Sequence, residues 1–251
     1  MKVEIWADVV CPWCYIGKRR FERALEAFPH RDDVEVVHRS FQLDPAAPAR
    51  RTEPTVERLA HKYGTSVEQA RAMMRRVERT AAEEGLEYDL AKTLSGNTFD
   101  AHRVLHLAKE KGRQDEVIER FYRAYFTERE SVFDHESLVR LAAEAGLDPD
   151  EARRVLEEGT YGDAVRADAA EAAALGVQGV PFFVIDRRYG VSGAQPTELF
   201  EQALARAWAE AQPLTRLESA DGPVCEDDTC AVPAEAADTP DVADAAGARR
   251  A

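Results

Sequence analysis

Two cysteines separated by two residues, Cys11 and Cys14, are the side chains of this chain best suited to do chemistry. On a helix they stand three positions apart and share one face, so their sulfurs can form and break a disulfide without unfolding the turn. The same spacing also occurs in half of a zinc site and in an inert buried pair. Zinc would need two more ligands at a compatible spacing, and no Cys or His pair near the motif supplies them. We therefore favour thiol–disulfide exchange.

The segments on either side of the motif indicate how the two thiols differ. The apolar run Val3 to Val10 predicts a strand, and Pro12 to about Phe28 has the apolar spacing of a helix that begins with proline. A sulfur at the start of a helix faces unpaired backbone N–H groups and the positive end of the helix dipole, and both stabilise a thiolate. We therefore expect Cys11 to attack the substrate and Cys14, one turn deeper, to resolve the mixed disulfide.

Residues beside the two cysteines are candidates for supporting roles. Asp8 lies at the strand end, where its carboxyl either relays a proton to or from Cys14 or is an ordinary loop acid. Pro12 and Trp13, between the cysteines, are expected to contact the substrate. The basic residues 18–20 follow one to two turns later and are expected to lie mainly in solvent.

Composition and charge exclude several classes of protein. The chain has 251 residues, of which 45% are hydrophobic, so it can form a real core. Its 47 acidic and 33 basic residues give a net charge of −14, which argues against a nucleic-acid or anionic-membrane surface. No apolar run approaches the ~18 residues that span a bilayer, and the charged, strand-like N-terminus does not resemble a signal peptide. We therefore predict a cytoplasmic protein, in which cysteines are more often catalytic or metal-binding than structural.

The order of predicted elements indicates an α/β fold. A buried strand at Asp33 to Leu43 is predicted to run parallel to the first, which makes a β-α-β unit with Cys11 at the carboxyl end of its first strand. Phe182 to Asp186 and Tyr189 to Ser192 predict an antiparallel hairpin, and a last helix begins at Pro196. Together these segments predict a four-stranded mixed sheet with flanking helices.

Between the two parts of this sheet lies a large all-helical insertion. We predict that residues 1–51 and 160–211 form the sheet domain, that 52–159 form the insertion and that 212–251 form a tail that ends in disorder. The insertion cannot bury all its apolar stripes alone, so it must pack beside the sheet and cover the Cys11 edge. Cap signals predict where its helices begin: Pro54, Ser66 with Gln69, Asn97 with Asp100, Asp134, Asp148 with Pro149, and Thr160 with Asp163.

A proline before the third strand is the second functional signal. Pro181 is either an ordinary proline that leads into a strand or a cis proline that exposes the Val180 backbone to an extended substrate chain. Trp13 would form an apolar rim near the sulfurs together with Trp6 and Phe183, although core packing explains Trp6 equally well.

Other side chains have weaker signals. His102 and His106 are spaced as a metal pair could be, but their motif lacks a metalloprotease Glu, so we expect groove-lining or packing histidines and no metal site. The helix face with Phe121, Tyr122 and Tyr125 is either core or the subunit interface of a homodimer.

These motifs together resemble the DsbA-like branch of the thioredoxin superfamily. The resemblance rests on Cys11-Pro12-Trp13-Cys14 after the first strand, Gly179-Val180-Pro181 before the third and the long insertion. The segments 41–45, 97–103 and 190–195 are similar to cytoplasmic FrnE-type members. The resemblance covers about Val3 to Trp208. It implies a thioredoxin fold in which Pro181 is cis and faces the two cysteines.

A second cysteine pair, Cys225 and Cys230, lies in an acidic segment near the C-terminus, as in some FrnE-type proteins. It could exchange with the Cys11–Cys14 disulfide as a relay, form a static local disulfide, or bind a soft metal. Acidic neighbours disfavour a thiolate, so this pair should be the poorer nucleophile.

We predict a thiol–disulfide oxidoreductase that forms, reduces or isomerises disulfides in protein substrates without a resident cofactor. One alternative is a glutathione-dependent transferase or isomerase, because the same branch includes 2-hydroxychromene-2-carboxylate isomerases and kappa-class glutathione transferases. Those relatives typically have Ser at the first motif position, whereas this chain has Cys11. In either case glutathione is a candidate co-substrate. The alternative outside enzymes is a holdase that binds unfolded chains.

Overall fold

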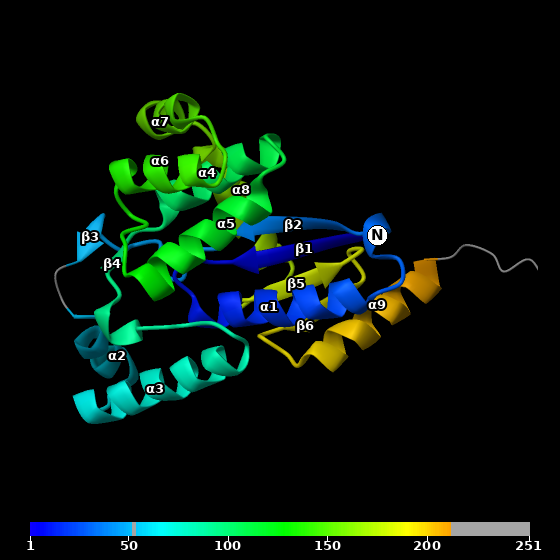
Figure 1. The fold of residues 1–251 in the computed structure, drawn as a ribbon, viewed down its shortest axis with the longest axis horizontal. Coiled ribbons are helices and arrows are strands. Elements are labelled where there is room, and N and C mark those ends of the chain that lie inside the picture. The colour runs from blue at the N-terminus through cyan, green and yellow to red at the C-terminus, as the bar shows by residue number, and fades with distance from the viewer. Residues whose placement is uncertain (52–53, 212–251) are drawn as a thin grey trace, which may run out of the picture. The chain divides into compact units, whose positions relative to one another are not determined.

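A mixed sheet in the order β2-β1-β5-β6 positions the Cys11 motif (Figure 1). The computed structural model describes residues 1–51 and 54–211. The strands are β1 (Lys2–Ala7), β2 (Glu35–Ser40), β5 (Phe182–Ile185) and β6 (Tyr189–Ser192). β1 runs parallel to β2 and antiparallel to β5, and β5 runs antiparallel to β6. The predicted β-α-β unit, C-terminal hairpin and thioredoxin fold with a helical insertion are confirmed.

Helices cover both faces of the sheet because its strands alternate apolar side chains between them. On one face α1 (Pro12–Ala27) packs beside α9 (Thr197–Ala211), and Phe21, Phe183 and Phe200 meet in the core between them. The other face packs on α8 (Gly162–Ala174).

Trp6 and Phe183 do not form the apolar rim that we predicted beside the sulfurs. Both are fully buried, and they lie on opposite faces of the sheet. The Trp6 indole N–H donates to the Asp168 carbonyl oxygen at 3.0 Å, which satisfies its polar atom in the core. Core packing, the alternative for Trp6, is therefore correct for both residues.

The insertion consists of several helices that lie next to α1 and the sheet (Figure 1). In chain order they are α2 (Thr55–Tyr63), α3 (Val67–Glu83), α4 (Phe99–Glu110), α5 (Gln114–Arg123), α6 (His135–Glu144) and α7 (Pro149–Glu158). Short 3-10 turns lie at Arg31–Asp33 and Leu90–Lys92. Two features were not predicted: α5 continues as a π-helix (Ala124–Glu128), and β3 (Arg50–Arg51) pairs with β4 (Ser95–Gly96).

Most predicted helix starts are confirmed by their caps. Ser66 and Gln69 form a full capping box, and the carboxylates of Asp134 and Asp148 accept N–H groups of their first turns. Two starts are wrong. α4 begins after Thr98, because the Asn97 carboxamide instead accepts the Phe99 N–H at 2.9 Å and a hydrogen bond from Gln42.

The second wrong start is that of α8. This helix begins at Gly162 and not at Thr160, because Tyr161 takes a left-handed conformation with φ of 65° that ends the preceding turn. The described part of the chain contains no helix with the length and apolarity that a membrane span requires.

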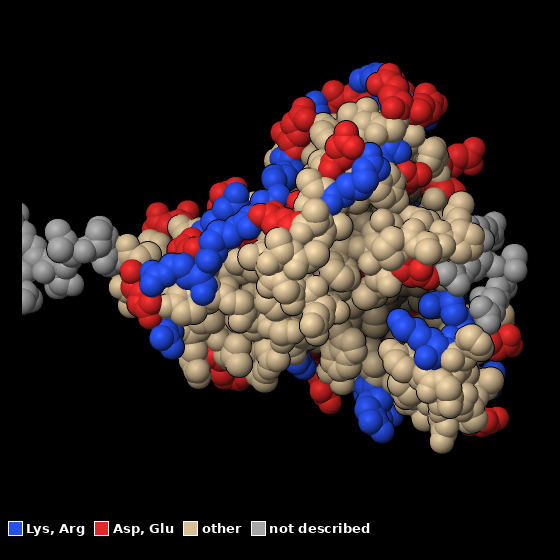
Figure 2. All heavy atoms as spheres, turned by 180° about the vertical axis from the view of Figure 1, so that it is seen from behind, with Lys and Arg blue, Asp and Glu red and all other residues tan. Residues whose placement is uncertain are grey.

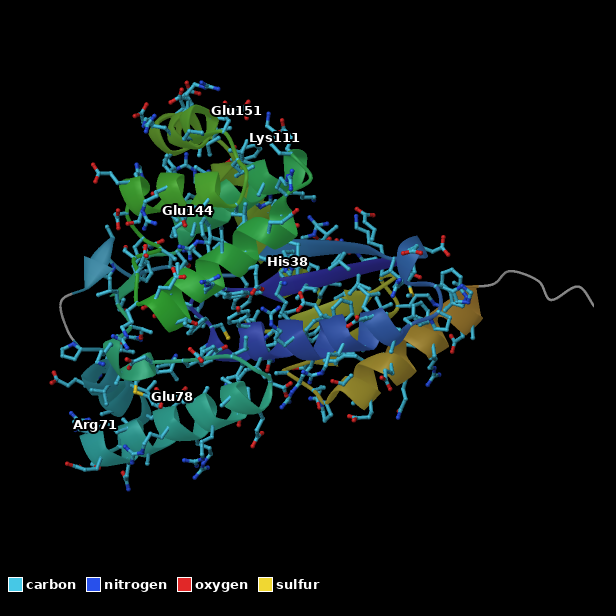
Figure 3. All side chains as sticks on the ribbon, in the orientation of Figure 1. His38, Arg71, Glu78, Lys111, Glu144 and Glu151 are labelled. Carbon is cyan, nitrogen blue, oxygen red and sulfur yellow. The ribbon has the colours of Figure 1, made fainter. Side chains whose placement is uncertain are left out.

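Lys18 is not in solvent as we expected. It is 3% exposed, and its ammonium lies 3.1 Å from Asp115, 3.2 Å from Glu119 and close to Glu22. Because α5 packs over this face of α1, its acidic residues replace the solvent around the lysine. Figure 3 shows His38 on β2 behind α5, and its Nε2 lies 3.4 Å from Asp115.

Candidate active site

The Cys11 backbone caps helix α1, as predicted. Cys11 has an extended conformation (φ −87°, ψ 112°), and Pro12 follows in the first turn. The Cys11 N–H donates to the Asp8 carbonyl oxygen, and the Cys14 N–H donates to the Cys11 carbonyl oxygen, each at 3.0 Å. The first turn therefore holds the two cysteines on one face of the helix.

The two cysteines are free thiols with different surroundings. Cys11 is 4% exposed and lines a cavity, whereas Cys14 is 2% exposed and does not line it. Burial raises the pKa of the Cys14 thiol well above its usual value, and the adjacent Cys11 sulfur raises it further. Cys14 is thus a protonated, inner thiol, and Cys11 is the sulfur that another molecule can reach through the cavity.

The two residues that precede β5, Val180 and Pro181, lie close to the Cys11 sulfur. The Val180–Pro181 peptide bond is cis, so the cis alternative is correct. The Cys11 thiol donates to the Val180 carbonyl oxygen at 3.6 Å. Gly17 permits this approach, because a Cβ at that position would lie 3.0 Å from Pro181 Cγ. Our sequence reasoning missed Gly17, whose only signal is a glycine inside a helical pattern.

Asp8 and His102 form a buried pair beneath the motif. Both are 1% exposed, and His102 Nε2 lies 3.3 Å from Asp8 Oδ1. The geometry is not that of a hydrogen bond, and Asp8 Oδ1 and both His102 ring nitrogens have no hydrogen-bond partner among the described residues. Asp8 Oδ2 accepts the Leu43 N–H at 2.8 Å. Asp8 also acts electrostatically on Cys14.

Of the two alternatives for His102, groove-lining or packing, the packing alternative is correct, because the side chain is buried and does not line the cavity. It lies on α4, where its neighbour is Asp8. His106, one turn later, faces Asp168 at 3.1 Å and Ser40 at 3.1 Å. The two histidines therefore contact different carboxylates.

Of the two residues between the cysteines, Trp13 is 41% exposed and Pro12 is half-buried; both line the cavity. The Tyr88 hydroxyl donates to the Pro12 carbonyl oxygen at 2.9 Å. Tyr88 stacks on Phe126, which also lines the cavity. A residue of the insertion thus holds the backbone of the motif, a contact that no local pattern predicts.

The cavity beside Cys11 has a volume of about 700 Å³, within the range of ligand sites. The sheet domain contributes Val10, Cys11, Trp13 and Val180 to its wall, and the insertion contributes the opposite wall. The prediction that the insertion covers the Cys11 edge is confirmed. Phe121, Tyr122 and Tyr125 are core residues of the chain itself, so the core alternative is correct for this helix face. Cys225 and Cys230 lie outside the described residues.

Known proteins resemble this chain in sequence and in fold. A probable DsbA oxidoreductase from Streptomyces coelicolor is 55% identical, with a TM-score of 0.81 over 93% of this chain and 100% of that one. The uncharacterized protein YwbO of Bacillus subtilis is 29% identical over 206 residues, which are 81% of this chain and 95% of YwbO. The cytosolic disulfide reductase DsbM of Pseudomonas aeruginosa, solved with GSH, has the same fold with a TM-score of 0.57 at 19% identity, over 83% of this chain and 100% of that one.

The chain also matches the DSBA-like thioredoxin domain over residues 2–205, a span that contains the cysteine motif, the insertion and the cis proline. The chain therefore belongs to the DsbA-like thioredoxin family of oxidoreductases.

Proposed function

We propose that this protein exchanges disulfides with protein substrates through Cys11. The Cys11 thiolate attacks one sulfur of a substrate disulfide, a Cys11–substrate bond forms, and the other substrate sulfur leaves as a thiolate that takes a proton. Cys14 then loses its proton and attacks Cys11 Sγ. The substrate is released reduced, and the enzyme holds the Cys11–Cys14 disulfide. The reverse sequence forms a disulfide in the substrate.

The observation that carries the proposal is the placement of Cys11. It is the N-cap of α1, it lines the cavity, and it lies 3.6 Å from a backbone carbonyl oxygen of Val180. An extended substrate chain beside Val180 would therefore present its sulfur to Cys11. The exposed Trp13 gives this edge an apolar contact for the same chain.

Single substitutions of the two cysteines test the proposal. Cys11→Ser should lower insulin reduction and disulfide exchange by roughly a thousandfold or more, because the thiol that lines the cavity is lost while Cys14 is buried behind it. Cys14→Ser should instead accumulate a mixed disulfide between Cys11 and the substrate, detectable by non-reducing electrophoresis and mass spectrometry. If Cys11→Ser retained wild-type exchange, the proposal would be wrong.

Two further parts of the proposal concern the tail and the compartment. We assign Cys225 and Cys230 to a relay that exchanges with the Cys11–Cys14 disulfide. Unchanged turnover and unchanged Cys11 reactivity after replacing both with Ser would remove this relay. We assign the activity to the cytoplasm, which cell fractionation tests.

Two competing functions have distinct signatures. A glutathione-dependent isomerase or transferase would saturate with glutathione on a chromene-type or electrophilic substrate and would stay active in Cys14→Ser. The size of the cavity, about 700 Å³, is the observation that supports this alternative. A holdase would suppress aggregation in a Cys-free variant and would lack insulin-reductase activity.

A further inference from the structure

One wall of the cavity beside Cys11 takes no part in the proposed disulfide exchange. Helix α2 contributes Arg58, His61 and Lys62 to this wall. Seen from behind, Lys and Arg atoms gather on the side of the α2–α3 segment that faces a hollow in the surface (Figure 2). Asp8 and Asp44, which follow the first two strands of the sheet, line the cavity from the side of the motif. The cavity therefore has a carboxylate side near the sulfur and a cationic side on α2.

Arg58 differs from the other partly buried arginines because no described residue supplies it with an acceptor. Its Nε is buried without a hydrogen-bond partner, and its guanidinium makes no ion pair with residues 1–51 or 54–211. By contrast, Arg20 binds Glu84 and Arg39 binds Asp168. The Arg58 Nε–H is withdrawn from water without an acceptor, and the planar fork of a guanidinium suits a carboxylate.

We propose that Arg58 binds an Asp or Glu side chain of the protein substrate, placed within a few residues of the reacting cysteine. This inference rests on the proposed function, because the sulfur at Cys11 defines where the substrate chain lies. The acid is not expected directly beside the substrate sulfur, because the Asp8 carboxyl lines the cavity next to Cys11 and would repel it.

The surroundings of Arg58 strengthen such a contact. Leu59, Met74 and Val77 line the cavity on the same side, and they limit the water that competes for the charge. Arg58 is thus a specificity residue: it should improve binding of an acidic substrate without changing the chemistry at Cys11.

The test uses disulfide-linked fluorogenic peptides in which one Glu is moved stepwise away from the cysteine on each side, each matched with a Gln peptide. At the best position the KM of the wild-type enzyme should be about tenfold lower for Glu than for Gln, with equal kcat. Arg58→Gln should abolish this difference, Arg58→Lys should retain part of it, and Arg58→Glu should favour a Lys peptide.

Arg71→Gln is the matched control. Arg71 is exposed at the outer end of α3 (Figure 3) and does not line the cavity, so the same loss of charge there should leave the Glu–Gln difference intact. Thermal unfolding of Arg58→Gln should match the wild type, because no described residue pairs with the Arg58 side chain.

Three results would overturn the inference. The first is equal KM for Glu and Gln peptides at every position while exchange proceeds, which leaves the proposed function standing. The second is a Glu–Gln difference that survives Arg58→Gln. The third is an Arg58 effect on oxidised glutathione alone and on no peptide, which would make the ligand a small molecule. Absence of exchange with every peptide would contradict the proposed function and this inference with it.

Discussion

Two groups of buried ionisable side chains lie along helix α1, and they are built in opposite ways. At Lys18, an ammonium that is 3% exposed lies within 3.2 Å of both Asp115 and Glu119, so the buried charge is paired. At the motif end, Asp8 and His102 lie 3.3 Å apart, and three of their polar atoms have no hydrogen-bond partner among the described residues.

The difference separates a structural role from a functional one. Breaking a paired buried charge leaves the remaining partners uncompensated, so the Lys18 group should stabilise the packing of α5 on α1. Unsatisfied buried polar atoms are costly, and those that lie beside reactive groups are candidates for a functional role. The Asp8–His102 pair lies beneath two reactive sulfurs, which supports a role for Asp8 in moving the Cys14 proton. The predictions below test this contrast.

The largest effect on stability is expected at the paired group. Lys18→Met should lower the free energy of unfolding by about 2 kcal/mol, because three carboxylates lose a shared cation while the solvent that reaches them screens part of the loss. Disulfide exchange should stay within about twofold of the wild type. Urea unfolding and an insulin-reduction assay measure the two quantities. The control is Lys111→Met, which breaks an exposed pair with Glu151 (Figure 3) and should cost under about 1 kcal/mol.

The pH dependence of this group follows from its pKa shifts. Burial opposes the charge on Lys18, but Asp115, Glu22 and Glu119 outweigh burial and raise the pKa of Lys18. Burial likewise opposes ionisation of Asp115 and Glu119. The His38 hydrogen bond and the Lys18 charge nevertheless lower the pKa of Asp115, and Lys18, the Tyr15 hydroxyl and Arg19 lower the pKa of Glu119.

The stability from the two carboxylates is therefore present above their unfolded pKa values, near pH 4, and is lost as pH falls through the lowered folded values. The stability contributed by Lys18 is present below its unfolded pKa, near 10.4, and is lost as pH rises through its raised folded pKa. The gap between wild type and Lys18→Met should thus be widest from about pH 5 to about pH 10. A gap that widened as pH fell below about 4 would contradict the pairing.

The largest effect on chemistry outside the cysteines is expected at Asp8. If the Asp8 carboxyl accepts the Cys14 proton, Asp8→Asn should slow release of the mixed disulfide at neutral pH by about a hundredfold. Stability should hold, since Asn keeps an oxygen for the Leu43 N–H. Rapid-mixing assays of product release from pH 6 to about 9.5 measure the rate of the variant, which should rise with pH because the small ionised fraction of Cys14 grows.

Faster release of the mixed disulfide in Asp8→Asn would indicate a different role for Asp8, in which its charge only opposes ionisation of Cys14. The Asp8 charge also raises the pKa of Cys14, after burial and Cys11 and by less than the Asp8 backbone hydrogen bond lowers it. If Asp8 acted only through this charge, Asp8→Asn would speed release and not slow it. His102→Gln should have a smaller effect in the same direction as Asp8→Asn, because His102 reaches the sulfur only through Asp8.

The smallest effect is expected at Tyr88, which belongs to neither of the two groups. Its hydroxyl contacts the backbone of the cysteine motif. Tyr88→Phe removes one hydrogen bond to the Pro12 carbonyl oxygen and should cost about 1 kcal/mol of stability. Stacking on Phe126 should persist. Alkylation of Cys11 should change less than about threefold; a tenfold change would mean that Tyr88 has a direct role in Cys11 reactivity.

Features with a local cause could be predicted from the sequence. Cys11 caps a helix because a strand ends and a proline follows, and Ser66, Asp134 and Asp148 cap helices because their side chains reach N–H groups of the next turn. The hairpin and the parallel strand follow from apolar patterns in the same way. Asn97 was placed wrongly because its carboxamide also binds Gln42, 55 residues away.

The sequence by itself determined which residues are available for chemistry and in what order the elements occur. Two thiols lie in the first turn of a helix, a proline precedes the third strand of the main sheet, and helices are inserted between the two halves of that sheet. Only the tertiary structure decided which charged side chains are paired. Lys18, His102 and Arg58 each lie on a helix with a clear apolar pattern, but their surroundings differ. Carboxylates enclose Lys18, and His102 lies next to Asp8 beneath the cysteine motif. Arg58 lines the cavity and has no acceptor in the described part of the chain. A helix pattern specifies a face of that helix, whereas the partner of that face comes from segments distant in the chain.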